Sequence, residues 1–124
     1  MGLFSSLLGN AGVIEPKKLA EFINPLLADN EKPEIGFNVF RDKIIFTNKR
    51  LIITDTQGLT GSKVSYLCIP YSKITKFSIE TTGTFDLDAE LKIWIGSEKD
   101  PIERKFNKKV NIFDVQKVLV SFTS

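Results

Sequence analysis

The sequence predicts a mainly β domain, in which seven short antiparallel strands form a bent sheet or partly open barrel, with helical segments at both ends of the chain. Two observations support this prediction. From Glu34 onward, apolar side chains recur at every second position and are β-branched or aromatic, as strands favour. From Asn111 onward, the spacing is that of an amphipathic helix. The chain has 124 residues, which is one domain that buries about 65 to 70% of its unfolded surface.

Residues 1–33 are expected to form an N-terminal helical extension. Pro16 fits a first helical turn and Pro25 is expected to interrupt the helix. No basic residue precedes Lys17, so the opening lacks the charge of a secretory signal or a membrane-surface helix. The string MGLFSS also fits a short myristoylation pattern, which has meaning only in a cell with the transferase. We expect the opening to pack on its own domain or on a neighbouring subunit through an apolar stripe of Leu3, Phe4, Leu7 and Leu8.

The strands are bounded by tight connections and by one glycine-rich loop, TQGLTGSK. Pro70 ends the fourth strand because it has no amide hydrogen to donate to a ladder. The predicted strands cover residues 34–40, 43–47, 50–56, 64–70, 74–81, 90–96 and 102–107.

A single amphipathic helix is predicted at the C-terminus. Asn111 is its expected N-cap, and Asp114 favours the positive end of the helix dipole. Its apolar stripe, which we expect to plug the end of the bent sheet, consists of Ile112, Val115, Leu119 and Phe122, with Val118 beside it.

Composition excludes several classes of protein. No apolar run approaches the roughly 18 to 20 residues that cross a bilayer. The net charge of +2 is too small to indicate a nucleic-acid partner. The single cysteine, Cys68, cannot form an internal disulfide, which fits a cytoplasmic protein.

Three strings and their order resemble the bacterial pleckstrin-homology (PH)-like domain family: FTNKRLIITD (Phe46 to Asp55), IPYSKI (Ile69 to Ile74) and GTFDLDAELKIW (Gly83 to Trp94). The resemblance covers residues 34–124 as the PH-like domain, and the N-terminal segment is also similar. It implies a seven-stranded bent pair of sheets capped by a helix, no enzymatic activity, no cofactor and assembly into ring-like homo-oligomers of undefined cellular role.

One departure from the wider PH fold concerns lipid recognition. Eukaryotic PH domains often bind inositol phosphates through a long first hairpin loop with spaced basic residues. Here that connection is only Arg41-Asp42-Lys43, which argues against phosphoinositide binding.

Catalysis is not indicated, because a chain without histidine lacks the commonest general base near neutral pH. Three acids in one extended segment could ligate Ca²⁺ or Mg²⁺ through oxygen, but acids just before a strand are more often a solvated turn. These weak candidate metal ligands are Asp86, Asp88 and Glu90.

Large apolar side chains on the second face of the strands predict a protein interface, because tryptophan and phenylalanine are enriched there. The candidate interface consists of Phe40, Ile45, Ile52 and Trp94, together with Leu3, Phe4 and Leu7. We expect it to join copies of this chain, and another protein partner remains open. The alternative is that the N-terminal segment covers this face within one chain.

Basic side chains supply a second functional hypothesis, a peripheral membrane or anionic-ligand adaptor. Scattered among hairpins, they are more simply explained as solvating charges. The candidates are Lys43, Lys49, Arg50, Lys73 and Lys76, with Lys108 and Lys109 as further members.

Overall fold

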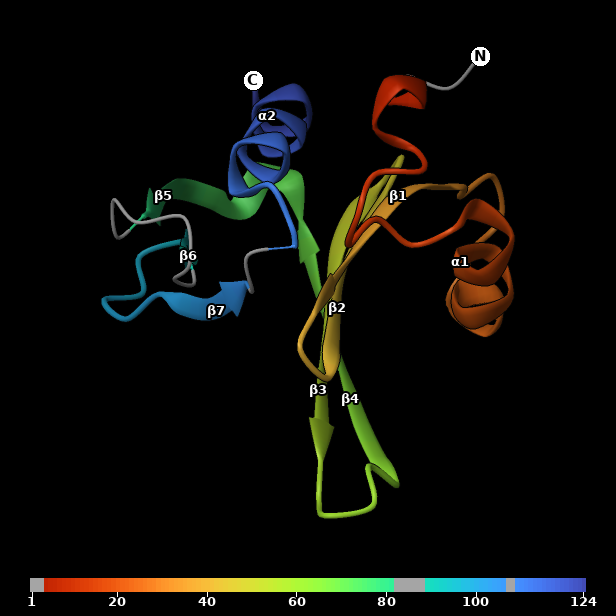
Figure 1. The fold of residues 1–124 in the computed structure, drawn as a ribbon. Coiled ribbons are helices and arrows are strands. Elements are labelled where there is room, and N and C mark those ends of the chain that lie inside the picture. The colour runs from red at the N-terminus through yellow and green to blue at the C-terminus, as the bar shows by residue number, and fades with distance from the viewer. Residues whose placement is uncertain (1–3, 82–88, 107–108) are drawn as a thin grey trace.

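The computed structural model describes residues 4–81, 89–106 and 109–124 and shows two antiparallel sheets set at an angle, with helices against both (Figure 1). The predicted strands are confirmed, and their ends differ from the prediction by one residue at most. The first sheet holds β1 (Pro33–Val39), β2 (Asp42–Thr47), β3 (Arg50–Gln57) and β4 (Lys63–Pro70) in that order. The second holds β5 (Ile74–Glu80), β6 (Ala89–Ile95) and β7 (Ile102–Phe106). The helices are α1 (Pro16–Ile23) and α2 (Ile112–Thr123), with 3-10 turns η1 (Ser5–Leu7), η2 (Asn24–Leu26) and η3 (Tyr71–Lys73).

Local residue chemistry sets the ends of both helices. Pro16 begins α1, where a missing amide hydrogen costs no helical bond. Pro25 ends it, and the chain continues as η2, so the predicted interruption is confirmed. The Asn111 side chain accepts a hydrogen bond from the Phe113 amide at 3.0 Å, which confirms the predicted N-cap of α2.

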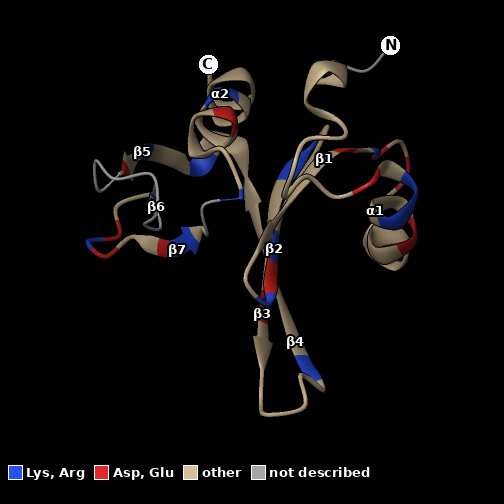
Figure 2. Ribbon diagram, in the orientation of Figure 1, with Lys and Arg blue, Asp and Glu red and all other residues tan. Residues whose placement is uncertain are grey.

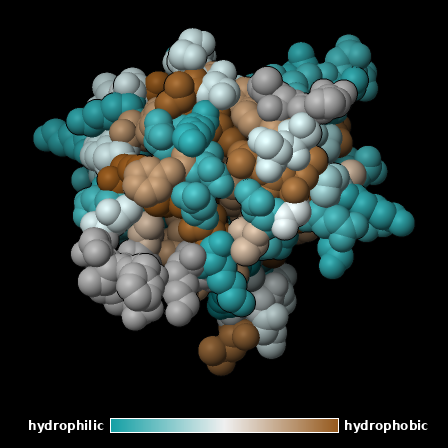
Figure 3. Space-filling model, turned by 45° about the horizontal axis from the view of Figure 1, so that its top comes forward, coloured by the Kyte–Doolittle hydropathy of each residue, from teal (hydrophilic) through white to brown (hydrophobic). Residues whose placement is uncertain are grey.

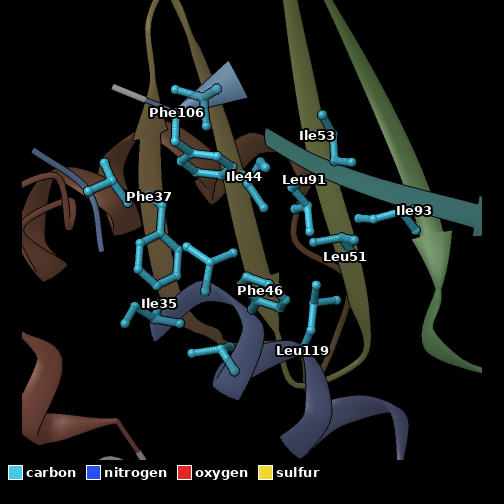
Figure 4. Close-up of a cluster of buried hydrophobic side chains, with 14 of the residues drawn as sticks. Ile35, Phe37, Ile44, Phe46, Leu51, Ile53, Leu91, Ile93, Phe106 and Leu119 are labelled. Atoms are coloured by element: carbon cyan, nitrogen blue, oxygen red, sulfur yellow. The ribbon is translucent and has the colours of Figure 1, made fainter. Parts of the chain in front are cut away.

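The main core lies between the inner faces of the two sheets and is closed by α2. Figure 4 shows side chains from both sheets and from α2 pointing toward one another. Phe122 of α2 stacks on Phe46 and on Tyr71, with ring centroids 5.8 Å and 4.6 Å away. The Tyr71 hydroxyl donates to the Thr47 carbonyl at 2.6 Å, and burial raises the pKa of Tyr71. The predicted plug therefore consists of the buried aliphatic side chains of Ile112, Val115, Val118 and Leu119, with Phe122 adding stacked aromatic contacts.

A second, smaller core lies on the outer face of the first sheet, beneath α1. Ile45 and Ile52 are register partners there, and both are fully buried against Leu19 and Ile23 of α1. The period-two pattern correctly placed them opposite the main core. The expectation that they belong to an exposed interface is wrong, because α1 covers them within the same chain, which is the alternative left open above.

The segment before α1 covers the β1 edge of the first sheet. The Ile14 amide donates to the Gly36 carbonyl at 2.8 Å, and the Asn38 amide donates to the Gly12 carbonyl at 2.8 Å. Gly12 has a φ of +83°, a conformation that favours glycine. These bonds leave β4 as the outer strand at the other side of the sheet.

The opening of the chain packs on its own domain, which was one of the two arrangements expected from the sequence. Phe4 is buried in the main core, with its ring centroid 5.6 Å from that of Phe122, and Leu7 packs against the same core. The predicted helical stripe is only the single turn η1, and Leu8 is exposed. Leu3 lies outside the described residues. Phe4 and Leu7, predicted for the interface between copies, thus contribute to the core of their own domain.

Candidate interaction surfaces

Arg50 is held by an internal carboxylate at one end of the first sheet. Its Nε lies 2.8 Å from Glu31 Oε2, and its Nη2 donates to the Leu26 carbonyl at 2.7 Å. Glu31 also accepts from the Ala28 amide and the Thr47 hydroxyl. The bonds from Arg50, outweighing burial and helped by these two donors, lower the pKa of Glu31 to about 2. Arg50 is therefore a structural cation whose charge is already balanced.

Beside this pair lies an open hollow of about 630 Å³, at the end of the sheet where β2 turns into β3. The Cys68 thiol is exposed in it and accepts a hydrogen bond from Arg50 Nη1 at 3.1 Å. We call this site the hollow; it is lined by Leu26, Ala28, Glu31, Lys49, Arg50, Cys68 and Pro70.

The opposite end of the first sheet carries two exposed apolar side chains, which we call the tip: Phe40 and Leu59. Phe40 lies between the paired residues Val39 and Asp42 and is 58% exposed, with a φ of +51°. Leu59, in the loop between β3 and β4, is completely exposed. Figure 3 shows hydrophobic atoms projecting from the lower end of the molecule, where that loop lies.

Hydrogen bonds join the two connections of the tip into one unit. Arg41 Nη2 donates to the Gly58 carbonyl at 2.7 Å, and the Thr56 hydroxyl donates to the Arg41 carbonyl at 3.2 Å. The Asp42 carboxylate accepts from the Thr56 amide. Phe40 and Leu59 are therefore presented by neighbouring, braced turns.

The outer edge of β4 is the third surface. Six of its eight residues are exposed, and it is the last strand of its sheet within the described part of the chain. Pro70 has no amide hydrogen, and the register with β3 is unbroken from Arg50 to Gln57. Because hydrogen-bonded and non-bonded pairs alternate, the amides in step with Pro70 point away from β3. These are the amides of Val64, Tyr66 and Cys68.

The outer face of the second sheet is a ladder of charges with one aromatic ring. Lys76 Nζ lies 4.6 Å from the ring centroid of Trp94, which is half-buried. Lys92 lies within 4.0 Å of carboxylates on all three strands, and the hydrogen bond that it donates to Glu80 contributes most to raising its pKa. The carboxylates belong to Glu80, Glu90 and Glu103.

The basic candidates do not form one site. Lys43 lies over the Phe22 ring on the α1 side of the first sheet, 4.8 Å from its centroid, whereas Lys76 lies on the second sheet. Lys49 borders the hollow and Lys73 is exposed in η3. Figure 2 shows these charges distributed over several separate elements. The structure thus brings Lys49 and Arg50 together and leaves Lys43, Lys73 and Lys76 apart, while Lys108 lies outside the described residues.

The acidic candidates are divided in the same way. Glu90 lies beside Lys92, and Asp86 and Asp88 lie outside the described residues. No group of three potential metal ligands occurs within residues 4–81, 89–106 and 109–124. The metal hypothesis therefore gains no geometric support from the part that is described.

Sequence reasoning placed Phe40 outward correctly, but it missed Leu59 and the hollow. The signal for Leu59 was available, since a lone apolar residue between Gly58 and Gly61 has little to pack against. The hollow had no such signal, because Leu26, Arg50 and Pro70 are far apart along the chain.

Among the helices that the structure describes, none has the length and apolarity needed to span a bilayer.

A model of the bacterial PH domain family matches residues 2–123. Two Bacillus subtilis (strain 168) proteins are similar to the chain, both uncharacterized. YjqA is 47% identical over 122 residues, which is 98% of each chain, and YozO is 34% identical over 100 residues, which is 81% of this chain and 85% of YozO.

Solved structures show the same fold. The PH domain from Shewanella amazonensis SB2B superposes with a TM-score of 0.84 and 41% identity, covering 99% of both chains. A DUF1696 family protein with a PH domain from Shewanella loihica PV-4 gives a TM-score of 0.80 and 46% identity, covering 94% of this chain and 99% of that one.

Proposed function

The chain belongs to the bacterial PH domain family, and we propose that it is a non-enzymatic interaction module that assembles with copies of itself into a closed, ring-like homo-oligomer in the cytoplasm. The observation that carries this proposal is the outer edge of β4. Eight residues long and mostly exposed, it presents a row of outward amides and carbonyls. Such an edge is a template for pairing with another chain.

One edge of the first sheet is covered by the same chain and the other is exposed, which supports pairing at β4. Residues 12–14 cover the β1 edge through main-chain bonds from the same chain. An exposed edge strand risks uncontrolled aggregation unless it is blocked or occupied. A ring of identical subunits occupies every such edge and ends the growth of the assembly.

Light scattering behind a sizing column tests the proposal on the full-length protein. We expect one discrete mass of several subunits that survives dilution and salt. A monomer at all concentrations would overturn the proposal.

Two variants locate the contact. Val64→Pro removes an outward amide, which an edge strand tolerates, and Val64→Lys places a charge beside the edge. Both should lower the mass while circular dichroism stays unchanged, whereas the matched control Leu8→Lys, at an exposed apolar residue elsewhere, should not. Folded Val64 variants of unchanged mass would show that β4 is not the contact.

A further inference from the structure

The tip has features that its own chain does not explain. Between paired strands, a positive φ at the first of two connecting residues is ordinarily taken by glycine, yet here it is taken by Phe40. A bulky side chain in this conformation is strained, and strain of this kind concentrates at functional positions. Its ring is mostly in solvent, and so is the whole Leu59 side chain. Two large apolar groups are therefore held outward at a cost to the fold.

The hollow has complementary properties at the other end of the same sheet. Its apolar lining comes from Leu26, Ala28 and Pro70, and the Arg50 charge on its floor is balanced by Glu31. The tip loop from Gly58 to Ser62 contains no charged residue, and Figure 2 shows it uncoloured by charge. The loop thus brings no charge of its own into a recess that contains the neutralised Arg50–Glu31 pair and the cation Lys49.

We propose that the tip of one copy seats in the hollow of the next, an inference that rests on the proposed self-assembly. Each chain carries one projection and one recess, at opposite ends of one sheet, so the contact is head-to-tail. Such a contact repeats from copy to copy and forms a ring when the rotation closes. Within one chain, β4 runs from Lys63 beside the tip to Cys68 and Pro70 at the hollow, so a single strand connects the two surfaces.

The single native cysteine provides a direct test. Cys68 lines the hollow, so Leu59→Cys would place a second thiol against it in the neighbouring copy. A disulfide needs Cα atoms within about 7 Å, which only a seated tip would satisfy. With diamide as oxidant and dilute protein, we expect a ladder of covalent species from dimer up to the full subunit number, reversed by reductant.

Controls separate the arrangements. Leu59→Cys combined with Cys68→Ser should give no species above a dimer, and Leu8→Cys, at an exposed residue elsewhere and with Cys68 retained, should give no ladder. A discrete oligomer by light scattering without a ladder would overturn the tip-to-hollow contact and leave self-assembly standing. A monomeric mass would overturn both.

A second variant does not depend on oxidation. Asparagine tolerates positive φ, so the double variant Phe40→Asn, Leu59→Asn should fold normally while losing the apolar tip. We expect its dissociation constant for assembly to rise at least tenfold, with Phe113→Asn on the exposed side of α2 unchanged. Equal assembly of all three proteins would also refute the contact.

Discussion

Arg50 binds Glu31 through two of its nitrogens, with Nε 2.8 Å from Oε2 and Nη2 3.1 Å from Oε1. This bidentate pair joins the turn between β2 and β3 to the segment that follows α1. The Glu31 side chain is only 1% exposed, so Arg50, and not water, stabilises its negative charge. The pair, with the bonds to the Leu26 carbonyl and the Ala28 amide, fixes this segment against the sheet and lines the hollow.

Replacing the carboxylate should destabilise the fold. Glu31→Gln leaves Arg50 without its balancing charge, and breaking a buried pair in this way costs about 3 kcal/mol. We take the lower end of the usual range because the Arg50 side chain is still 26% exposed. Urea unfolding measures the loss, with Glu98→Gln as an exposed control. Equal unfolding midpoints for both variants would contradict the structural role of the pair.

The same pair predicts a dependence of stability on pH. The pKa of Glu31 is about 2 in the folded chain, against an ordinary value of 4.5. Below pH 4.5 the unfolded chain binds a proton that the folded chain does not, so the contribution of Glu31 is present above that pH and declines as pH falls toward 2. Unfolding at pH 7, 5, 4 and 3 should show a steeper decline for the natural chain than for Glu31→Gln. Parallel curves would refute the assignment.

Phe4 is predicted to stabilise the domain although it stands at the start of the chain. Phe4→Ala removes a ring that packs in the main core against Phe122 and should cost about 3 kcal/mol. The exposed neighbour Leu8→Ala should change stability by less than about 0.5 kcal/mol. Thermal unfolding compares the two, and a similar small effect from both would mean that the opening does not pack in solution.

Trp94 remains a predicted interface residue. Trp94→Glu places a carboxylate beside Lys76, which preserves a partner for that cation and should leave the fold intact. If the outer face of the second sheet contributes to assembly, light scattering should show folded subunits of lower mass. An unchanged mass would assign the interface to the first sheet alone.

Local pattern was sufficient for the elements. The change of apolar period at Glu34 predicted every strand, and Asn111 predicted the start of α2, because backbone pairing and capping depend on neighbouring residues. Pro25 predicted the end of α1 for the same reason, since a missing amide hydrogen acts within one helical turn.

The candidate surfaces were decided by tertiary structure. The alternation of apolar residues in the strands predicts that Ile45 and Ile52 share a face of the sheet. Only the packing of α1 determines that this face is covered. Glu31 and Arg50 are 19 residues apart in the sequence. Their ion pair therefore forms only when the chain between them has folded. The sequence by itself therefore determined the order and type of the elements, while the tertiary structure decided which side chains are buried, which meet and which remain exposed. Exposure depends on contacts between distant segments, which no local period encodes.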